Sequence, residues 1–102
     1  MGNALIRISS QELCQSEGVE RELIIRVVEH GIVHPLEGRA ASEWVFDVSS
    51  IHWIKKALRL RRDFDIDWIA VALVIDQMRR NEALQRENEA YQRQLSRFLE
   101  QG

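Results

Sequence analysis

The fold is decided by one stretch, Val19-Glu20-Arg21-Glu22-Leu23-Ile24-Ile25-Arg26-Val27-Val28-Glu29-His30-Gly31. It predicts a helix with one buried face, because apolar residues recur at helical spacing, at Leu23, Ile24, Val27 and Val28. The other face is then exposed, and it carries Glu22, Ile25, Arg26 and Glu29. Gly31 is a natural left-handed terminator for such a helix.

A shorter helix is predicted just before this stretch. Ser9 and Glu12 have the spacing of a capping box, in which each side chain satisfies a backbone N–H of the other residue. We therefore expect a helix over residues 10–16 that stops before Gly18. The three or four residues between the two helices are typical of a helix-turn-helix. In DNA-binding proteins of that type, the second helix enters the major groove.

The charge distribution argues against that use of the helix. The 102 residues carry a formal net charge of −2, but the charge is uneven. Residues 1–47 hold four arginines and eight acidic residues, a net charge of −4, which leaves +2 for residues 48–102. Because DNA binding requires a basic face, nucleic-acid binding is expected to be weak or absent.

After Gly31 the sequence predicts a two-stranded wing. Residues 32–36 are too short for a helix and contain Pro35, so they predict an edge strand, with residues 37–42 as a turn and residues 43–46 as the returning strand. Asp47 is a good N-cap for a third helix, whose inner stripe is Ile51, Ile54 and Leu58. Trp53 and Leu60 lie on nearly the opposite side. They could meet a partner or pack under the next helix, and the second interpretation is favoured.

Asp65 is expected to cap the last helix. This helix should be long, because residues 66–101 contain neither Gly nor Pro. About 34 helical residues would extend ~50 Å. Residues 66–75 are apolar on all sides, which predicts burial on more than one side. Farther along, a seam with coiled-coil spacing consists of Leu84, Asn88, Tyr91, Leu95 and Phe98. The distal half cannot reach the N-terminal core, so we expect a homodimer through these residues. The seam does not reveal the direction of the pairing.

The predicted fold is therefore mainly α, with a winged helix-turn-helix domain at residues 1–64 and a long dimerisation helix at residues 65–102. Cys14 is alone, so an intrachain disulfide is impossible. Residues 1–3 lead into no apolar signal run, and no apolar run reaches roughly 18 residues, which favours a cytoplasmic protein without a membrane segment. His30 and His34 lie across a helix end without further ligands, so no metal is expected. The sequence shows no set of residues typical of a catalytic site and no glycine-rich phosphate-binding loop. We therefore expect neither an enzyme nor a cofactor.

In the order of their predicted elements, residues 5–80 resemble the MerR-type winged DNA-binding module. The resemblance is carried by residues 9–13, 17–19, 29–35 and 44–47. MerR regulators commonly carry Thr-Leu-Arg-Tyr-Tyr in the second helix and Gly-Tyr-Arg in the wing. This chain instead has Leu23-Ile24-Ile25-Arg26-Val27 and Ser42-Glu43-Trp44, so most of the DNA-contacting pattern is missing.

A narrower resemblance is to CbpM, a family of small chaperone modulators. It is carried by residues 43–47, by Ala57-Leu58-Arg59-Leu60-Arg61, by Asp67-Trp68-Ile69-Ala70-Val71-Ala72-Leu73, and by Gln94-Leu95-Ser96-Arg97-Phe98. The resemblance implies a dimer that binds the J-domain of a CbpA/DnaJ-like cochaperone and blocks its action with the DnaK chaperone. It also implies a basic helix on the J-domain, which suits an acidic partner.

The candidate partner-binding residues are Glu22, Glu29, Glu37, Glu43 and Trp44. Each glutamate has a simpler interpretation as a solvated acid. Trp44 could anchor an interface or cover the core. A MerR-like transcriptional regulator is the alternative function, because the bases from Lys55 to Arg62 leave residual DNA contact open. A purely structural dimerisation module is the third possibility.

Overall fold

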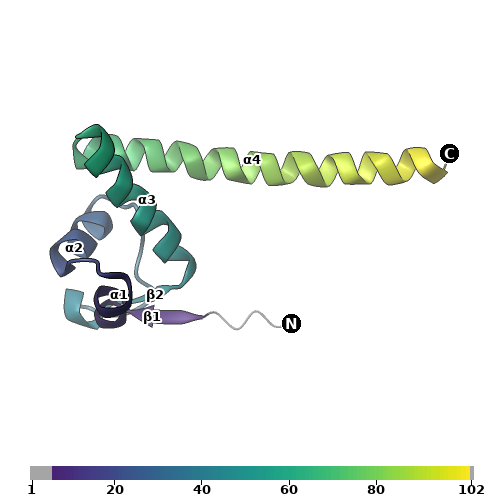
Figure 1. The fold of residues 1–102 in the computed structure, drawn as a ribbon. Helices are drawn as coiled ribbons and strands as arrows, with labels where there is room; N and C mark the ends of the chain where they lie inside the picture. Colours follow the sequence, from purple (N-terminus) through teal and green to yellow (C-terminus); the bar gives the residue numbers. More distant parts are fainter. Residues whose placement is uncertain (1–5, 102) are drawn as a thin grey trace.

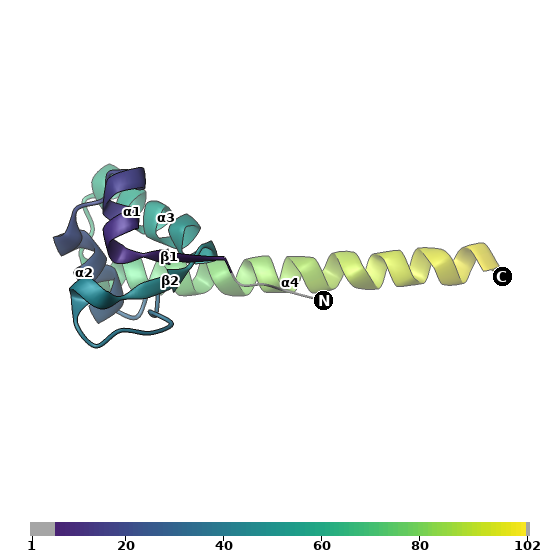
Figure 2. The same cartoon turned by 90° about the horizontal axis from the view of Figure 1, so that it is seen from below.

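A computed structural model describes residues 6–101 of the chain. Residues 1–5 and 102 lie outside this description, and they include the first three residues considered above for a signal sequence. The elements run in the order β1 (Arg7–Ser9), α1 (Ser10–Glu17), α2 (Arg21–Glu29), η1 (Ala41–Glu43), β2 (Val45–Asp47), α3 (Ser49–Phe64) and α4 (Trp68–Gln101). Figures 1 and 2 show a small domain from which α4 extends as a straight rod. The predicted mainly α winged helix-turn-helix, with a two-stranded sheet and a long C-terminal helix, is confirmed.

Both ends of α1 follow the predicted local signals. The Glu12 N–H donates to Ser9 Oγ at 3.0 Å, and the Ser9 N–H donates to Glu12 Oε1 at 3.0 Å, which completes the capping box. Gly18 ends the helix with a φ of +67° and donates its N–H to the Cys14 carbonyl at 3.1 Å. The turn into α2 is therefore fixed by short-range bonds.

Helix α2 has the buried face and the terminator that its sequence predicts. Ile24 and Val27 are almost fully buried. Gly31 takes a φ of +70°, and the next N–H, that of Ile32, reaches back to the Val27 carbonyl at 2.9 Å. The Gly31 N–H donates to the Val28 carbonyl at 3.0 Å. Together these bonds form a Schellman motif, which satisfies carbonyls that the end of the helix would otherwise leave open.

The sheet has two strands, as expected, but the predicted first strand is wrong. β2 pairs antiparallel with β1, with Arg7 opposite Asp47 and Ser9 opposite Val45. The segment at residues 32–36 forms no strand, and its continuation contributes only an isolated bridge between Glu37 and Val45. The physical reason lies in Ile32 and Val33, which are each 1% exposed. They direct the chain into the core, and Pro35 has no N–H to donate to a ladder.

Two predicted helix caps are displaced. Asp47 remains in β2, and α3 begins at Ser49, whose N–H donates to Asp47 Oδ1 at 3.0 Å. Asp65 does not cap α4; it takes a left-handed φ of 51° and ends α3. The α4 cap is Asp67, because its Oδ1 accepts the Ala70 N–H at 2.8 Å. An aspartate tolerates the left-handed conformation better than most residues, so it can end a helix as well as start one.

The core is closed by the first turns of α4. Its buried apolar side chains are Leu13, Val19, Ile24, Val27, Ile32, Val33, Phe46, Ile54, Ala57, Val71 and Ile75. Trp53 packs under α4, as favoured above, with its ring centre 5.0 Å from the Arg79 guanidinium. The expected burial of residues 66–75 on more than one side is not seen in the single chain. Within residues 6–101, no helix is both long enough and apolar enough to cross a membrane.

Candidate partner-binding surface

The outer face of α2 is only weakly acidic, because one arginine lies between its two glutamates. Arg26 Nη2 is 3.9 Å from Glu22 Oε1, and Arg26 Nη1 is 3.6 Å from Glu29 Oε2. The spacings of four and three residues bring all three side chains to the same side of the helix. Their side chains are about half or more exposed. The three residues therefore carry one net negative charge on an accessible ridge.

The other two candidate acids lie on the wing. Glu37 Oε2 accepts a hydrogen bond from Arg7 Nη1 at 2.7 Å, so its charge is paired across the sheet. Glu43 ends η1 and is exposed. The loop between them is tight: Gly38 has a φ of +108°, and an added Cβ would lie 2.4 Å from the Glu43 carbonyl oxygen. Figures 1 and 2 show α2 and the segment before β2 at the end of the molecule away from the tip of α4.

Trp44 follows η1 directly and is partly buried. Its ring meets the fully buried Phe46 edge-on, with ring centres 6.3 Å apart and an interplanar angle of 74°. Its carbonyl accepts the Ser10 N–H at 2.9 Å, which ties the wing to α1. Trp44 thus packs against the core, and the remaining exposed part of its ring is what it can offer to a partner.

The predicted dimerisation residues all lie on the distal part of α4. Asn88 is exposed, and the large side chains are exposed by more than half, with Leu84 at 61%, Tyr91 at 62%, Leu95 at 58% and Phe98 at 73%. They extend beyond the last core residue of α4, Ile75. The structure therefore places the candidate acidic residues at one end of the molecule and the exposed apolar seam on the distal part of α4.

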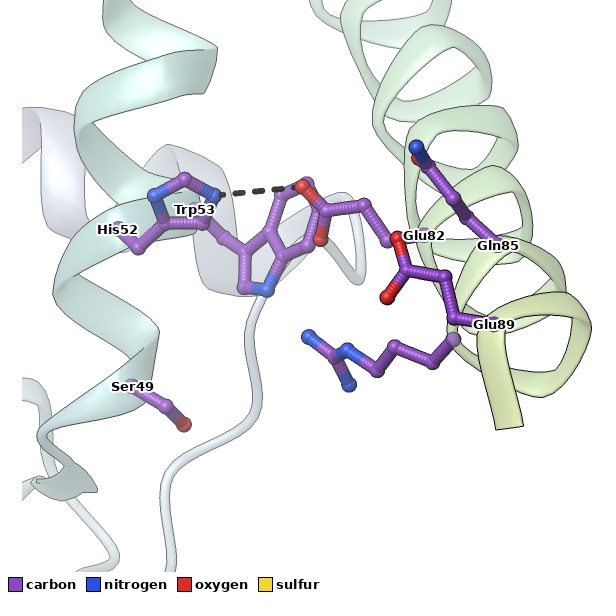
Figure 3. A pocket seen from close by; sticks show the side chains of 7 residues that line it. Ser49, His52, Trp53, Glu82, Gln85 and Glu89 are labelled. Carbon is purple, nitrogen blue, oxygen red and sulfur yellow. Dashed lines mark ion pairs between the residues drawn. The ribbon is translucent and has the colours of Figure 1, made fainter. Parts of the chain in front are cut away.

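Sequence reasoning missed the crevice between α3 and α4, which has a volume of about 570 Å³. Figure 3 shows His52 and Trp53 projecting from α3 toward Glu82 on α4. Glu82 Oε1 lies 3.9 Å from His52 Nε2 and 4.0 Å from Lys56 Nζ. These contacts join residues that lie 30 and 26 positions apart in sequence, so no local pattern could reveal them. They hold α4 against α3. Among residues 6–101, no group of three or more potential metal ligands is found.

A second feature that the sequence did not reveal is a groove where the end of α2 meets the start of α4. It has a volume of about 360 Å³ and is lined by His30, Gly31, Ile69, Ala72, Leu73 and Asp76. His30 stacks on Trp68 with ring centres 6.1 Å apart. Its Nδ1 lies 3.0 Å from the Arg26 carbonyl, at the C-terminal end of α2 where a histidine is favourable. The histidine therefore forms a helix end and one wall of the groove.

Comparison with known proteins agrees with this architecture. The family model described as "MerR HTH family regulatory protein" matches residues 8–93. The chaperone modulatory protein CbpM of Pseudomonas entomophila is 33% identical over 94% of both chains, and that of Pseudomonas putida is 32% identical over the same share. The chaperone modulatory protein CbpM of Citrobacter koseri is 32% identical over 97% of both chains. The chain belongs to the CbpM family of chaperone modulatory proteins, within the MerR helix-turn-helix family.

Proposed function

We propose that this protein is a non-enzymatic chaperone modulator. As a homodimer, it binds the J-domain of a CbpA/DnaJ-like cochaperone and inhibits the action of that cochaperone with the DnaK chaperone. The observation that carries the proposal is the acidic ridge of α2, formed by Glu22, Arg26 and Glu29. It is supported by membership of a family whose relatives are named chaperone modulatory proteins. A helix that reads DNA would present cationic side chains at this place.

The proposed mechanism is competition for one surface. The resemblance to CbpM implies a basic helix on the J-domain, which an acidic surface attracts before contact and holds after it. The net charge of −4 on residues 1–47 supplies the long-range attraction whether or not individual acids are paired. Glu22, Glu29, Glu37 and Glu43 are the candidate contacts, and the exposed part of Trp44 would add an apolar anchor. A bound J-domain would then be unable to reach the DnaK-type chaperone.

The proposed homodimer forms through α4. Leu84, Asn88, Tyr91, Leu95 and Phe98 would pack against the same residues of a second copy, since their exposed apolar area is otherwise costly in water. Sedimentation at tens of micromolar tests this part alone. A monomer at that concentration would contradict it.

The alternative function is a MerR-like DNA-binding regulator, which the fold itself favours. Its best support is the group of bases on α3, but three of these are already paired, one of them being Lys56 with Glu82. Lys55 contacts Glu17, and Arg62 Nε lies 3.2 Å from Asp63 Oδ1. This alternative requires tight, sequence-selective binding to an operator near its own gene. A mobility-shift assay that shows only weak, sequence-independent binding would reject it.

The test is calorimetric titration of the full-length protein with an isolated J-domain from a DnaJ-like cochaperone of the same organism, at 100 mM salt. The double reversal Glu22→Lys/Glu29→Lys should weaken the complex by about tenfold or more, because it moves four charge units on the ridge. The matched control is Glu89→Lys/Glu100→Lys, which makes the same charge change on the distal part of α4. Absence of binding by the unmodified protein would reject the proposal.

A further inference from the structure

One side of α3 carries basic residues next to apolar ones. Lys55, Leu58 and Arg62 follow one another at spacings of three and four residues, which brings them to the same side of the helix. Two grooves of about 450 and 340 Å³ open there, and they adjoin because Leu58 and Arg62 line both. We call the two together the basic groove. It is defined by Leu23, Lys55, Leu58, Arg59, Arg61 and Arg62.

The basic groove has a net positive charge. Its charged lining consists of Lys55, Arg59, Arg61 and Arg62 against Glu17 and Asp65, a net charge of +2. Lys55 is paired with Glu17. Within residues 6–101, Arg59 and Arg61 have no carboxylate at ion-pair distance. The groove therefore has the opposite sign to the acidic ridge of α2.

The arginines are placed to bind carboxylates. Arg61 is held by Trp68, whose ring centre lies 4.8 Å from the guanidinium carbon. Arg62 Nε donates to Asp63 at 3.2 Å, which leaves the terminal nitrogens of a side chain that is 75% exposed for another acceptor. Bases in the last turn of α3 also stabilise that helix end, but Arg59 lies before the last turn. Stabilisation of the helix end therefore does not account for the whole groove.

The floor of the basic groove is apolar. Leu23 and Leu58 line it and are partly buried against the core. Phe64, three residues after Arg61 and therefore on the same side of α3, is 68% exposed. A nucleic-acid backbone is bound mainly through its phosphate charges, whereas a peptide can offer carboxylates and apolar side chains together. Apolar contacts beside arginines thus favour a peptide.

We propose that the basic groove binds an acidic peptide segment of a partner protein. Apolar side chains of the segment would rest on Leu23 and Leu58, and its carboxylates would pair with the guanidinium groups of Arg59 and Arg62. Leu23 is one residue from Glu22, about 100° round α2, so the acidic ridge and the basic groove lie on different sides of that helix. The inference goes beyond J-domain binding and does not depend on it. The protein could then hold two partners of opposite charge.

Fluorescence anisotropy of the full-length protein with a synthetic peptide tests this proposal. The probe is a short fluorescein-labelled peptide in which leucines alternate with pairs of glutamates, and its counterpart has serines in place of the leucines. We expect saturable binding of the leucine peptide that weakens as salt rises. The serine peptide should bind about tenfold more weakly or worse, because it buries less apolar surface.

The double reversal Arg59→Glu/Arg62→Glu should weaken binding of the leucine peptide by about tenfold or more, because it moves four charge units beside the peptide. The matched control Arg93→Glu/Arg97→Glu makes the same charge change on the distal part of α4 and should leave Kd unchanged. All four arginines are exposed, so both variants should fold, which circular dichroism checks. The milder Arg59→Gln/Arg62→Gln replaces the first variant if it does not fold.

Absence of saturable binding to the unmodified protein would overturn the proposal, as would equal binding of the two peptides or equal losses in the two reversal variants. Labelled oligothymidylate that binds as tightly as the leucine peptide would also overturn it, by showing a general site for polyanions. Sedimentation supplies the last check. A smaller assembly for Arg59→Glu/Arg62→Glu alone would mean that the acidic ridge of a second copy fills the groove, again against the proposal.

Discussion

Replacing Arg26 by glutamine should strengthen J-domain binding, although it removes a charged side chain from the proposed interface. Arg26 lies between Glu22 and Glu29, at 3.9 and 3.6 Å, and it neutralises one of their two charges. The substitution Arg26→Gln changes the net charge of the ridge from −1 to −2. The affinity for a basic partner should therefore rise, and any affinity for DNA should fall.

The size of the effect follows from the exposure of the group. The Arg26 side chain is 47% exposed, so its charge acts largely through water. One unit charge on a partner at roughly 6 Å then contributes about 0.7 kcal/mol, which corresponds to about a threefold change in Kd. The attraction should fade as salt rises, since the Debye length shortens to about 8 Å at physiological ionic strength.

Calorimetry at 50 and 300 mM salt measures the effect. We expect about threefold tighter binding of the isolated J-domain at low salt and a smaller gain at high salt. The variant Arg93→Gln, on the distal part of α4, is the matched control for net charge and should leave Kd unchanged. Circular dichroism checks α2, because a base near a helix C-terminus also stabilises the helix slightly.

Weaker J-domain binding by Arg26→Gln would refute the reasoning, because it would mean that the arginine itself contacts the partner. Equal tightening by Arg93→Gln would also refute it, by showing that only total charge matters. A large loss of DNA affinity, from a tight starting value, would support the MerR-like regulator instead.

Three further predictions concern the scaffold. Trp44→Ala should lower the free energy of unfolding by roughly 2 kcal/mol, since the ring is only partly buried; an unchanged denaturation midpoint would contradict its packing against the core. Gly38→Ala should lower the melting temperature of the domain, because its φ is +108° and an added Cβ would lie 2.4 Å from a backbone oxygen; calorimetric scanning with no shift would count against this loop geometry. Hydrogen bonds from Ser9 lower the pKa of Glu12 below 4.5, so its stabilising effect on α1 is complete above pH 4.5 and is lost as pH falls through the lower folded-state pKa; amide exchange at Ser9 should accelerate in that range, and Glu12→Gln should abolish the dependence.

Local signals in the sequence were enough to predict most helix ends. The capping box at Ser9 and the terminator Gly31 act within a few residues of where they stand, and both are formed as predicted. The cap of α4 was assigned to Asp65 instead of Asp67, because two aspartates flank Ile66 and either could cap. The choice depends on which of them takes the left-handed conformation, and that is set by how α3 and α4 pack.

Long-range pairing was less predictable. β1 has only three residues, and its partner lies about forty positions away, so no periodicity reveals it. The segment after Gly31 has a strand-like composition, but Ile32 and Val33 are needed in the core. Tertiary packing here overrides local propensity.

The candidate site was predictable in charge, but its ion pairs were predictable only within one helix. The excess of acids in residues 1–47 can be counted, and the spacing of Glu22, Arg26 and Glu29 already implies contacts along one helix. The pairing of Glu37 with Arg7 spans 30 residues, so it could not be predicted without knowing how the strands pair. The exposure of Ile69 and Leu73 likewise required the docking of α4, because the sequence shows only that its first turns are apolar.

The most direct test of the central claim is the ATPase rate of a DnaK-type chaperone stimulated by its J-domain cochaperone. Adding this protein should return the stimulated rate to the basal rate, and a higher concentration of the chaperone should restore stimulation, as expected for competition. Glu22→Lys/Glu29→Lys should require a correspondingly higher concentration to inhibit. A stimulated rate that stays unchanged at saturating amounts of the folded, unmodified protein would contradict the account.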